Sequence, residues 1–572
     1  MTAGTTVGER TEHPVGGDLR PEGPPRTPVV GRGIRLLLAV GVALLVGAGL
    51  LARLGLVGGD AIGAADNGDA IRLYCVAGLV PDTSDRAAPG HGVAVTEYRT
   101  GGPGCPREAP TSSAGLVLQA TVAVTTALDA TPPAPDGSDR FTLEWLAAVY
   151  VGLLAAGAGV AAFAATSAPS LAGRRARRVA PVLLAVVVPP LLPLLAVPWW
   201  SRFLVSSFSE SAGVLGAAWM AWGLLTIAVT RPTDRGARAA ALGLIGLGGV
   251  VAATGKPGFL PVGLLAVAIC AVVTVGTRRW WRRAPGLAVA LLAVAVAAPA
   301  VLSGIAAQDA AYDKVNAHNL AFTAVLPESG PAATAALGLR PEAFRQAGQH
   351  FYLDGGRSVP GWAETVGARP DELRSAARLW VAQHPLVLAR MVHRGLVATL
   401  RPHIPYLASE TGGPRTVSGD IPRPSYPEGS QLMGPTFVYF DGLPGRWVPP
   451  TVVVLALLAA ALALIASRVP RLAAATTPTA RGLALTAGAL AVTALGIVLV
   501  AVLGDGYCEL AKHVWLGSYV LVVTAATLVA CGVAAGAGWL RARGDRGDRT
   551  DERTDDRTDP IARPVPDGAA GW

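Results

Sequence analysis

The stretch that decides the fold lies near the C-terminus and runs from Gly482 to Leu540: GLALTAGALAVTALGIVLVAVLGDGYCELAKHVWLGSYVLVVTAATLVACGVAAGAGWL. Two blocks of it, residues 482–503 and 515–538, contain no charged side chain. Each is long enough to cross a bilayer as an α-helix of about 20 residues. Because backbone polar groups in lipid must be satisfied within the segment, both blocks are predicted to be transmembrane helices joined by a short charged turn.

Apolar blocks of the same kind recur along the whole chain. They are predicted at residues 34–57, 144–166, 179–198, 211–230, 239–253, 258–276, 286–304, 449–467, 482–503 and 515–538. Of the 572 residues, 51% are hydrophobic and only 15% are charged, which is too apolar for a soluble protein of this size. We therefore expect an all-α polytopic membrane protein with about ten transmembrane helices. The fifth block is short and rich in glycine, which is typical of a tilted, broken or re-entrant helix.

Arginines between the blocks predict the orientation. On one side of the predicted membrane stand Arg174, Arg175, Arg177, Arg178, Arg231, Arg235, Arg238, Arg278, Arg279, Arg282, Arg283, Arg468, Arg471 and Arg481. By the positive-inside rule this side is cytoplasmic, so a multi-pass protein of the cell (plasma) membrane with both termini inside is expected. The net charge of +9 is dispersed among these clusters, without a basic stripe interleaved with aromatics, which argues against nucleic-acid binding.

The spans divide the chain into seven predicted parts. These are a cytoplasmic disordered tail (1–33), a first transmembrane helix (34–57), an extracytoplasmic loop (58–143), a transmembrane bundle (144–304), a mainly helical extracytoplasmic domain (305–448), a second bundle (449–538) and a second cytoplasmic disordered tail (539–572). Disorder is expected in the last part because its charges alternate without apolar residues. A helix that begins at Asp371 has apolar residues at three-to-four spacing and is predicted to be amphipathic.

The first extracytoplasmic loop opens with an acidic turn. Asp60, Asp66 and Asp69 lie within ten residues of one another, and Asn67 with the following glycine favours a tight turn between the last two acids. Carboxylates at the bilayer surface can accept a proton or hold a cation. The alternative is a solvated turn that only ends the helix. In the same loop, Cys75 and Cys105 are predicted to form a disulfide because they lie in the compartment where disulfides persist.

Two shorter outer connections each contribute a charge. Glu210 stands at the mouth of a span, where an acid is costly unless it faces a cavity or a partner, and this makes it a site candidate. Lys256 follows the glycine-rich block and can meet a phosphate at the membrane surface. The alternative for Lys256 is snorkelling to lipid headgroups.

The last outer connection is the most charged. Asp505, Glu509, Lys512 and His513 occur within nine residues at the mouth of the final span and within helical reach of one another. Two acids and two bases at one mouth favour a functional site, and the alternative is an interfacial ion-pair network.

Together these motifs resemble polytopic membrane glycosyltransferases of the GT-C type, in particular bacterial glycan-biosynthesis hexosyltransferase-like proteins. The resemblance covers residues 34–538, excluding the tails. It rests on Asp66-Asn67-Gly68-Asp69 with Arg72, on Ser206 to Glu210, on Lys256-Pro257, on Asn319 to Ser329 and on Gly504 to His513. The sequence departs from the resemblance at Ser209-Glu210-Ser211, where similar proteins have Ser-Glu-Pro.

The resemblance implies transfer of a sugar from a polyprenyl-phosphate donor to an extracytoplasmic glycan or lipid-linked acceptor. An acid of the first outer loop would be the base or a ligand of a divalent cation such as Mg or Mn, which points to Asp66 or Asp69, with Glu210 as a further catalytic candidate. A lipid phosphate lies at headgroup level, so interfacial cations are expected to bind it. The donor-phosphate candidates are Arg72, Lys256, Lys512 and His513, and the other site candidates are Asn67, Asn319, Glu328, Asp505 and Glu509.

Two other functions remain open at this point. A secondary transporter or flippase of envelope precursors also has about ten spans and charges at their ends, although such proteins seldom carry some 140 residues of outer domain between two spans. A non-catalytic envelope assembly protein would use its outer segments to bind other proteins, and it would tolerate substitution of Asp69.

Overall fold

The computed structural model describes residues 31–58, 61–64, 69–82, 96–105, 109–131, 133, 137, 139–167, 179–276, 281–352, 360–402, 404 and 444–555. In this part of the chain nine helices are long and apolar enough to cross a membrane. They are α1 Arg32–Arg53, α4 Leu143–Ser167, α5 Val179–Ala196, α7 Glu210–Val229, α8 Arg235–Gly255, α10 Ala284–Asn319, α16 Val448–Arg468, α18 Pro478–Gly504 and α20 Trp515–Asp555. The prediction of an all-α polytopic membrane protein is confirmed.

The predicted sixth span is the shortest of the apolar helices that lie within the bundle. It forms a 3₁₀ turn, η4 Pro257–Phe259, followed by α9 Leu260–Val272. At 1.5 Å per residue the two together are about 24 Å long, less than the hydrocarbon thickness of about 30 Å. The η4–α9 segment is therefore too short to cross a bilayer unless its flanking residues contribute.

The prediction of a broken or re-entrant fifth span is wrong, because α8 is continuous over 21 residues. Its glycines serve close packing against α7 instead. A Cβ atom on Gly216 of α7 would lie 2.4 Å from the backbone oxygen of Gly248, and one on Gly248 would lie 2.5 Å from that of Gly216. Small residues that let two helix backbones touch are the usual means by which membrane helices associate.

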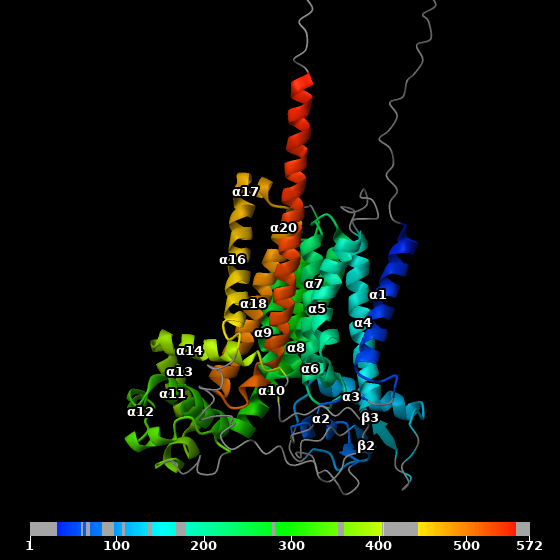
Figure 1. Ribbon diagram of the computed structural model, residues 1–572. Helices are drawn as coiled ribbons and strands as arrows, with labels where there is room; N and C mark the ends of the chain where they lie inside the picture. The colour runs from blue at the N-terminus through cyan, green and yellow to red at the C-terminus, as the bar shows by residue number, and fades with distance from the viewer. Residues whose placement is uncertain are drawn as a thin grey trace, which may run out of the picture.

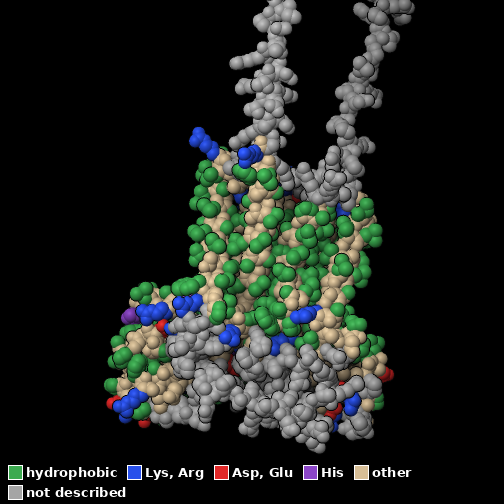
Figure 2. All heavy atoms as spheres, in the orientation of Figure 1, with side chains coloured by type: hydrophobic (Ala, Val, Ile, Leu, Met, Phe, Trp, Pro, Cys, Tyr) green, Lys and Arg blue, Asp and Glu red, His purple; other side chains and the backbone are tan. Residues whose placement is uncertain are grey.

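The spans run side by side as one bundle with two unlike ends (Figure 1). Helix α1 begins, and α20 leaves the bundle, at one end, which we call the terminal end. The other end carries the loop after α1 and the helices α11–α14, and we call it the domain end. Hydrophobic side chains cover the flank of the bundle, whereas coloured charged side chains lie toward its ends (Figure 2). This is the distribution expected of a protein whose flank is solvated by lipid.

At the domain end, the loop after α1 forms a small sheet that the sequence analysis did not predict. Strands β1 Leu79–Pro81, β2 Glu97–Thr100 and β3 Arg140–Thr142 pair antiparallel in that order. The strands are too short for a period-two pattern to emerge from the sequence. Buried Tyr98 and Phe141 face each other across β2 and β3 and anchor the sheet.

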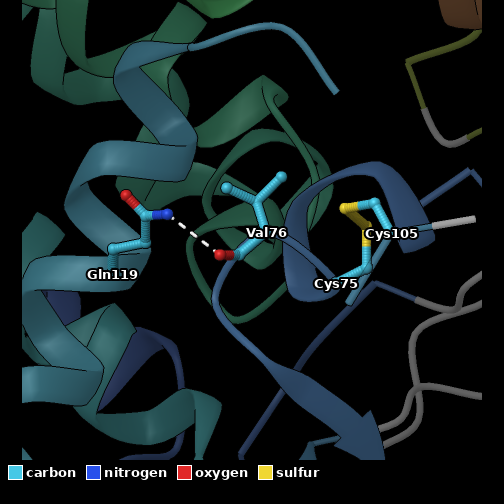
Figure 3. Close-up of a disulfide and its surroundings, with 4 residues drawn as sticks. All are labelled: Cys75, Val76, Cys105 and Gln119. Carbon is cyan, nitrogen blue, oxygen red and sulfur yellow. Dashed lines mark hydrogen bonds between the residues drawn. A yellow bond between two sulfur atoms is a disulfide. The ribbon is translucent and has the colours of Figure 1, made fainter. Parts of the chain in front are cut away.

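Two helices and a disulfide complete this loop. The short α2 Ile71–Tyr74 is followed by Cys75, which is bonded to Cys105 (Figure 3). Helix α3 Ser113–Ala127 is preceded by its N-cap residue Ser112. The Ser112 side chain accepts a hydrogen bond from the N–H of Gly115. Gln119 of α3 donates to the carbonyl oxygen of Val76 at 2.9 Å, which ties α3 to the turn that follows Cys75 (Figure 3).

The second region at the domain end grows directly out of α10. This helix runs on into the π-helical segment η5 Leu320–Val325 and then α11 Leu326–Ser329. The remaining elements are α12 Ala332–Ala336, η6 Pro341–Gln346, η7 Ala363–Gly367, α13 Pro370–Gln383 and α14 Pro385–Ala398. Helix α13 is amphipathic and buries Leu373, Ala377 and Val381, whereas Leu379 stays exposed.

Three short helices and a 3₁₀ turn join the spans. Helix α6 Pro198–Ser201 and the 3₁₀ turn η3 Arg202–Leu204 connect α5 to α7 at the domain end. Helix α17 Pro470–Ala475 lies between α16 and α18, and α19 Leu510–His513 lies between α18 and α20. The connection that contains α19 is the charged turn quoted at the start.

The predicted C-terminal tail is described only over residues 539–555, and residues 556–572 lie outside the described part. Disorder was expected from residue 539, but α20 continues as a helix to Asp555. The costly step in helix formation is nucleation, and the membrane span has already provided it. Each further residue then adds one backbone hydrogen bond, so a charged segment continues the helix that it follows.

Candidate functional site

Lys512 is the centre of the charged residues at the domain end. It lies on α19 and is only 4% exposed. Its Nζ contacts the carboxylate of Asp69, which lies 443 positions earlier in the chain, and lies 3.2 Å from Oε2 of Glu509. The acidic turn after the first helix and the charged mouth of the last helix therefore meet.

Asp69 has a second basic partner. Arg72, one helical turn further on, donates to its carboxylate, and the Arg72 guanidinium also lies 5.1 Å from the ring centre of Tyr312 on α10. Burial alone would raise the pKa of Asp69, but the charges of Lys512 and Arg72 outweigh it and hold that pKa well below its usual range. Asp69 is therefore ionised at neutral pH.

The same balance applies to Lys512. Burial alone would lower its pKa, but Glu509 and Asp69 together raise the pKa of the ammonium group above its usual value. Lys512 is thus a permanently charged, almost fully enclosed cation with two carboxylates around it.

A second ion pair lies beside the first. Glu210 begins α7 and is 2% exposed, and its Oε1 accepts a hydrogen bond from Nζ of Lys256 at 2.9 Å. The helix N-terminus also favours a negative charge at this position. Glu210 acts electrostatically on Lys512 and Arg72, and Lys256 acts on Asp69. We call the four residues around Lys512 and this second pair together the charged cluster, which comprises Asp69, Arg72, Glu210, Lys256, Glu509 and Lys512.

Asp505 and His513 border the charged cluster. Nε2 of His513 lies 3.1 Å from Oδ2 of Asp505, and Oδ1 of Asp505 accepts a hydrogen bond from the side-chain amide of Asn319 at 2.7 Å. Between these groups, Gly506 has φ +59°, and a Cβ atom there would lie 2.5 Å from the backbone oxygen of Asn319. The close approach of the last connection to α10 thus requires glycine at position 506.

Asn319 stands where α10 changes its winding. The π-helical segment η5 begins one residue later, and π-helical turns are frequent at functional sites. In η5, the hydroxyl of Thr323 accepts a hydrogen bond from the N–H of Tyr507 at 2.7 Å. Helix α10 and its continuation therefore hold the last connection through both Asn319 and Thr323.

Glu328, a predicted site candidate, belongs to a different group. Its Oε1 accepts hydrogen bonds from the hydroxyl of Tyr507 at 2.7 Å and from Nε of Arg394 at 2.5 Å. Its backbone oxygen accepts from Arg390 at 2.9 Å. We call Glu328, Tyr507, Arg390 and Arg394 the domain tie, because they join α11 and α14 to the last connection.

The predicted divalent-cation site finds no support in the surroundings of Asp69. Asp66 and Asn67 lie outside the described residues. Within the part of the chain that the structure describes, no group of three or more His, Cys, Asp or Glu side chains is arranged to hold a metal ion. The carboxylate of Asp69 already faces two cationic side chains, Lys512 and Arg72, which compete with a metal cation for it.

Sequence reasoning missed three residues around this site. Tyr312 lies against Arg72, and His350 interacts electrostatically with Glu509 and Asp505. Tyr352 interacts electrostatically with Asp505 and Asp69. None of the three stands in a motif or next to the end of a predicted outer loop, so only the three-dimensional arrangement reveals them.

Comparison with known families gives a match over residues 32–365, which is more than half of the chain, to the YfdI N-terminal transmembrane domain family. The chain belongs to this family. No curated protein and no solved structure matches it. The YfdI domain takes in Asp69, Arg72, Glu210 and Lys256 of the charged cluster, together with the first seven of the ten apolar helices described above. Lys512 and Glu509 lie beyond its end, so the charged cluster joins the YfdI domain to the C-terminal spans.

Proposed function

We propose that the chain is a membrane glycosyltransferase of the GT-C type, which transfers a sugar from a polyprenyl-phosphate donor to an extracytoplasmic glycan or lipid-linked acceptor. The observation that carries the proposal is the contact between Asp69 and Lys512 within the charged cluster at the domain end. The resemblance of the outer-loop motifs to GT-C enzymes supports it, as does membership of a family defined by a transmembrane domain.

The charged cluster can bind such a substrate if the donor phosphate replaces a carboxylate as the partner of a cationic side chain. A polyprenyl chain stays in lipid, so its phosphate lies at the level where the spans end. The cluster offers three cations there, Arg72, Lys256 and Lys512, and each already holds a carboxylate. A phosphate oxygen is the natural competitor for such partners, because cationic N–H groups bind phosphate and carboxylate by the same charge-assisted hydrogen bonds.

The replacement of Asp69 by the donor phosphate as the partner of Lys512 and Arg72 also prepares Asp69 to act as a general base. In the free protein its pKa is well below the usual range, which makes it a weak base. When the donor phosphate takes Lys512 and Arg72, the cations no longer stabilise the carboxylate, and burial raises its pKa. Asp69 then becomes a competent base for the acceptor hydroxyl only after the donor is bound. The hydroxyl oxygen attacks the sugar C1, the bond from C1 to the phosphate oxygen breaks, and the proton of the hydroxyl passes to Asp69.

Orientation follows from the connections at the terminal end. They carry arginines, namely Arg231, Arg235, Arg238, Arg282, Arg283, Arg468, Arg471 and Arg481. The positive-inside rule places this end in the cytoplasm and the charged cluster at the extracytoplasmic surface of the cell membrane. Glu210 and His513 are assigned to the same site, Glu210 as the partner that fixes Lys256 and His513 as the partner of Asp505.

The test is a transfer assay with purified protein in proteoliposomes. Polyprenyl-phosphate hexoses, each labelled in the sugar, are supplied with short glycan and lipid-linked acceptors, and the labelled product is followed. Asp69→Asn is compared with wild type, and transfer is expected to fall about 10²- to 10⁴-fold, the usual contribution of a general base. The matched control is Asp82→Asn, because Asp82 is another acid of the first loop that is paired with two arginines, Arg99 and Arg140.

One outcome would overturn the role of Asp69, and two would overturn the proposed function. Equal transfer by wild type and Asp69→Asn removes Asp69 from the reaction. Movement of intact lipid-linked sugar across the membrane without cleavage identifies a transporter or flippase. The absence of both transfer and movement, with a stable complex with another envelope protein, identifies an assembly protein. Asp66→Asn is tested in parallel, since both acids of the turn are candidates for the base.

A further inference from the structure

Residues 350–352 are held beside the charged cluster by one side chain. The amide oxygen of Asn319 accepts a hydrogen bond from the N–H of Phe351 at 2.9 Å, while its amide nitrogen donates to Asp505 at 2.7 Å. Asn319 is fully buried. The backbone around Phe351 is therefore fixed relative to the carboxylate of Asp505 by a bridge of one residue.

Tyr352 uses this fixed position to present its ring outward. Its N–H donates to Nδ1 of His350 at 3.2 Å, and its ring packs against that of Phe351 with 5.2 Å between the ring centres. The residue nevertheless remains 60% exposed. Partial burial and the nearby Tyr312, together with Asp505 and Asp69, raise the pKa of Tyr352 to about 12, so its hydroxyl is neutral.

The position of Tyr352 is unusual among the exposed aromatic side chains. Five tryptophans that are also more than a third exposed lie at the ends of spans: Trp145, Trp199, Trp281, Trp447 and Trp539. Aromatics there form the belt that anchors a protein at the membrane surface. Tyr352 lies between η6 and η7, away from the end of any described span, so membrane anchoring does not account for it.

Sugar rings need two kinds of contact. Their hydroxyls are best bound by carboxylates and amides, whereas the C–H groups on one face of a pyranose are apolar and weakly positive. The face of an aromatic ring is negative and attracts such groups. The charged cluster and Asp505 provide the polar contacts, and Tyr352 provides the aromatic surface one residue after Phe351, whose N–H Asn319 ties to Asp505.

We propose that Tyr352 is the stacking surface for a pyranose ring whose hydroxyls bind Asp505 and Asp69. This inference rests on the proposed function and specifies the sugar subsite of the same site. The ring belongs to either the donor or the acceptor, and the experiments below separate the two.

The first experiment measures sugar binding without turnover. Saturation-transfer NMR is recorded on the purified full chain in detergent with methyl β-D-glucopyranoside and methyl α-D-mannopyranoside as probes. Tyr352→Leu is expected to abolish saturation transfer from the protein to the C–H protons of the sugar ring. Tyr352→Phe is expected to keep it, because the aromatic face remains. Trp281→Leu is the matched control, since this aromatic is also more than half exposed and lies at the other end of the bundle. No signal from wild type, or an undiminished signal from Tyr352→Leu, overturns the proposal.

The second experiment assigns the ring and separates this inference from the proposed function. In the transfer assay, Tyr352→Leu is expected to raise the KM of one substrate about 2- to 10-fold and to leave the KM of the other unchanged. Unchanged KM values for both, with transfer intact, overturn the stacking surface while the glycosyltransferase stands. The opposite outcome is also possible to recognise. If the wild type gives the NMR signal but no sugar transfer, and Tyr352→Leu loses that signal, the glycosyltransferase is overturned and the sugar-binding surface stands.

Discussion

Asp69 and Glu328 are both acids paired with basic side chains at the same end of the bundle, yet they are held in different ways. The side chain of Glu328 is 3% exposed and is bound by Tyr507 and Arg394. The side chain of Asp69 is 31% exposed, and Arg72, one of its two cations, is 47% exposed. Both Glu328 and Arg394 are largely buried, which leaves little access for a competitor, whereas the charged cluster opens to solvent at Asp69 and Arg72 while Lys512 lies enclosed behind them. The domain tie is therefore a structural contact, and the charged cluster is suited to bind an anion.

The largest effect that tests this contrast is expected from Lys512→Met. The substitution leaves Asp69 and Glu509 without their shared cation and removes a phosphate ligand, so transfer should fall about 10²- to 10³-fold. The chain has three lysines, and the third, Lys314, is exposed. Lys314→Met is therefore the control. Comparable activity of the two variants in the transfer assay would remove Lys512 from the site.

A substitution in the domain tie is expected to lower the stability of the protein and to leave the transfer reaction unchanged. Glu328→Ala leaves Arg394 without this buried partner, and removal of one member of such a pair costs about 3–5 kcal/mol. We expect a lower Tm in detergent, with transfer per folded molecule preserved below that temperature. Glu372→Ala, which removes a surface pair with Arg369, should change stability by about 0.5 kcal/mol or less. A selective loss of transfer in Glu328→Ala at unchanged Tm would contradict the contrast.

A pH profile sharpens the contrast further. In the free protein Asp69 stays ionised well below pH 4, so it imposes no acid limb on kcat/KM above about pH 4. Once the donor phosphate occupies Lys512 and Arg72, the pKa of Asp69 rises, and kcat should fall with acid at a higher pH than kcat/KM does. Profiles of both constants between pH 4 and 8 measure this difference. Acid limbs that coincide would argue against exchange of partners.

The smallest effect is expected from Arg72→Gln. Arg72 is half exposed, so solvent weakens its pairing, and loss of such a contact costs about 0.2–1 kcal/mol. The donor KM should rise about 1.5- to 5-fold and the acceptor KM should stay constant. An increase in the acceptor KM alone would place Arg72 away from the phosphate.

The spans could be predicted from the sequence because lipid imposes a simple rule of length and apolarity. The same rule fails where packing decides, as at Gly248 in the continuous helix α8, which lies close against Gly216 of α7. It also fails for three strands too short to show a period.

The site was predictable in part. The charges at the ends of spans stand out in an apolar sequence, and Asp69 and Lys512 were both predicted as site candidates on the same side of the membrane. That Asp69 and Lys512 form a direct pair was not predictable, because pairing across 443 positions depends on how the bundle packs. Glu328 and Asp505 look alike in sequence, but only Asp505 borders the charged cluster, and Tyr352 carries no sequence signal.

Helix α10 extends from the lipid to the wall of the site as one uninterrupted element, with Pro299 inside its membrane half. Proline removes a backbone hydrogen bond and is the common point at which helices bend. Asn319 lies 20 residues further on, about 30 Å along the axis. A bend of about 10° at Pro299 therefore moves Asn319 by about 5 Å. Helix α10 therefore links bilayer depth to the contacts of Asn319 with Asp505 and Phe351, so that a change of angle at Pro299 would be carried directly to them.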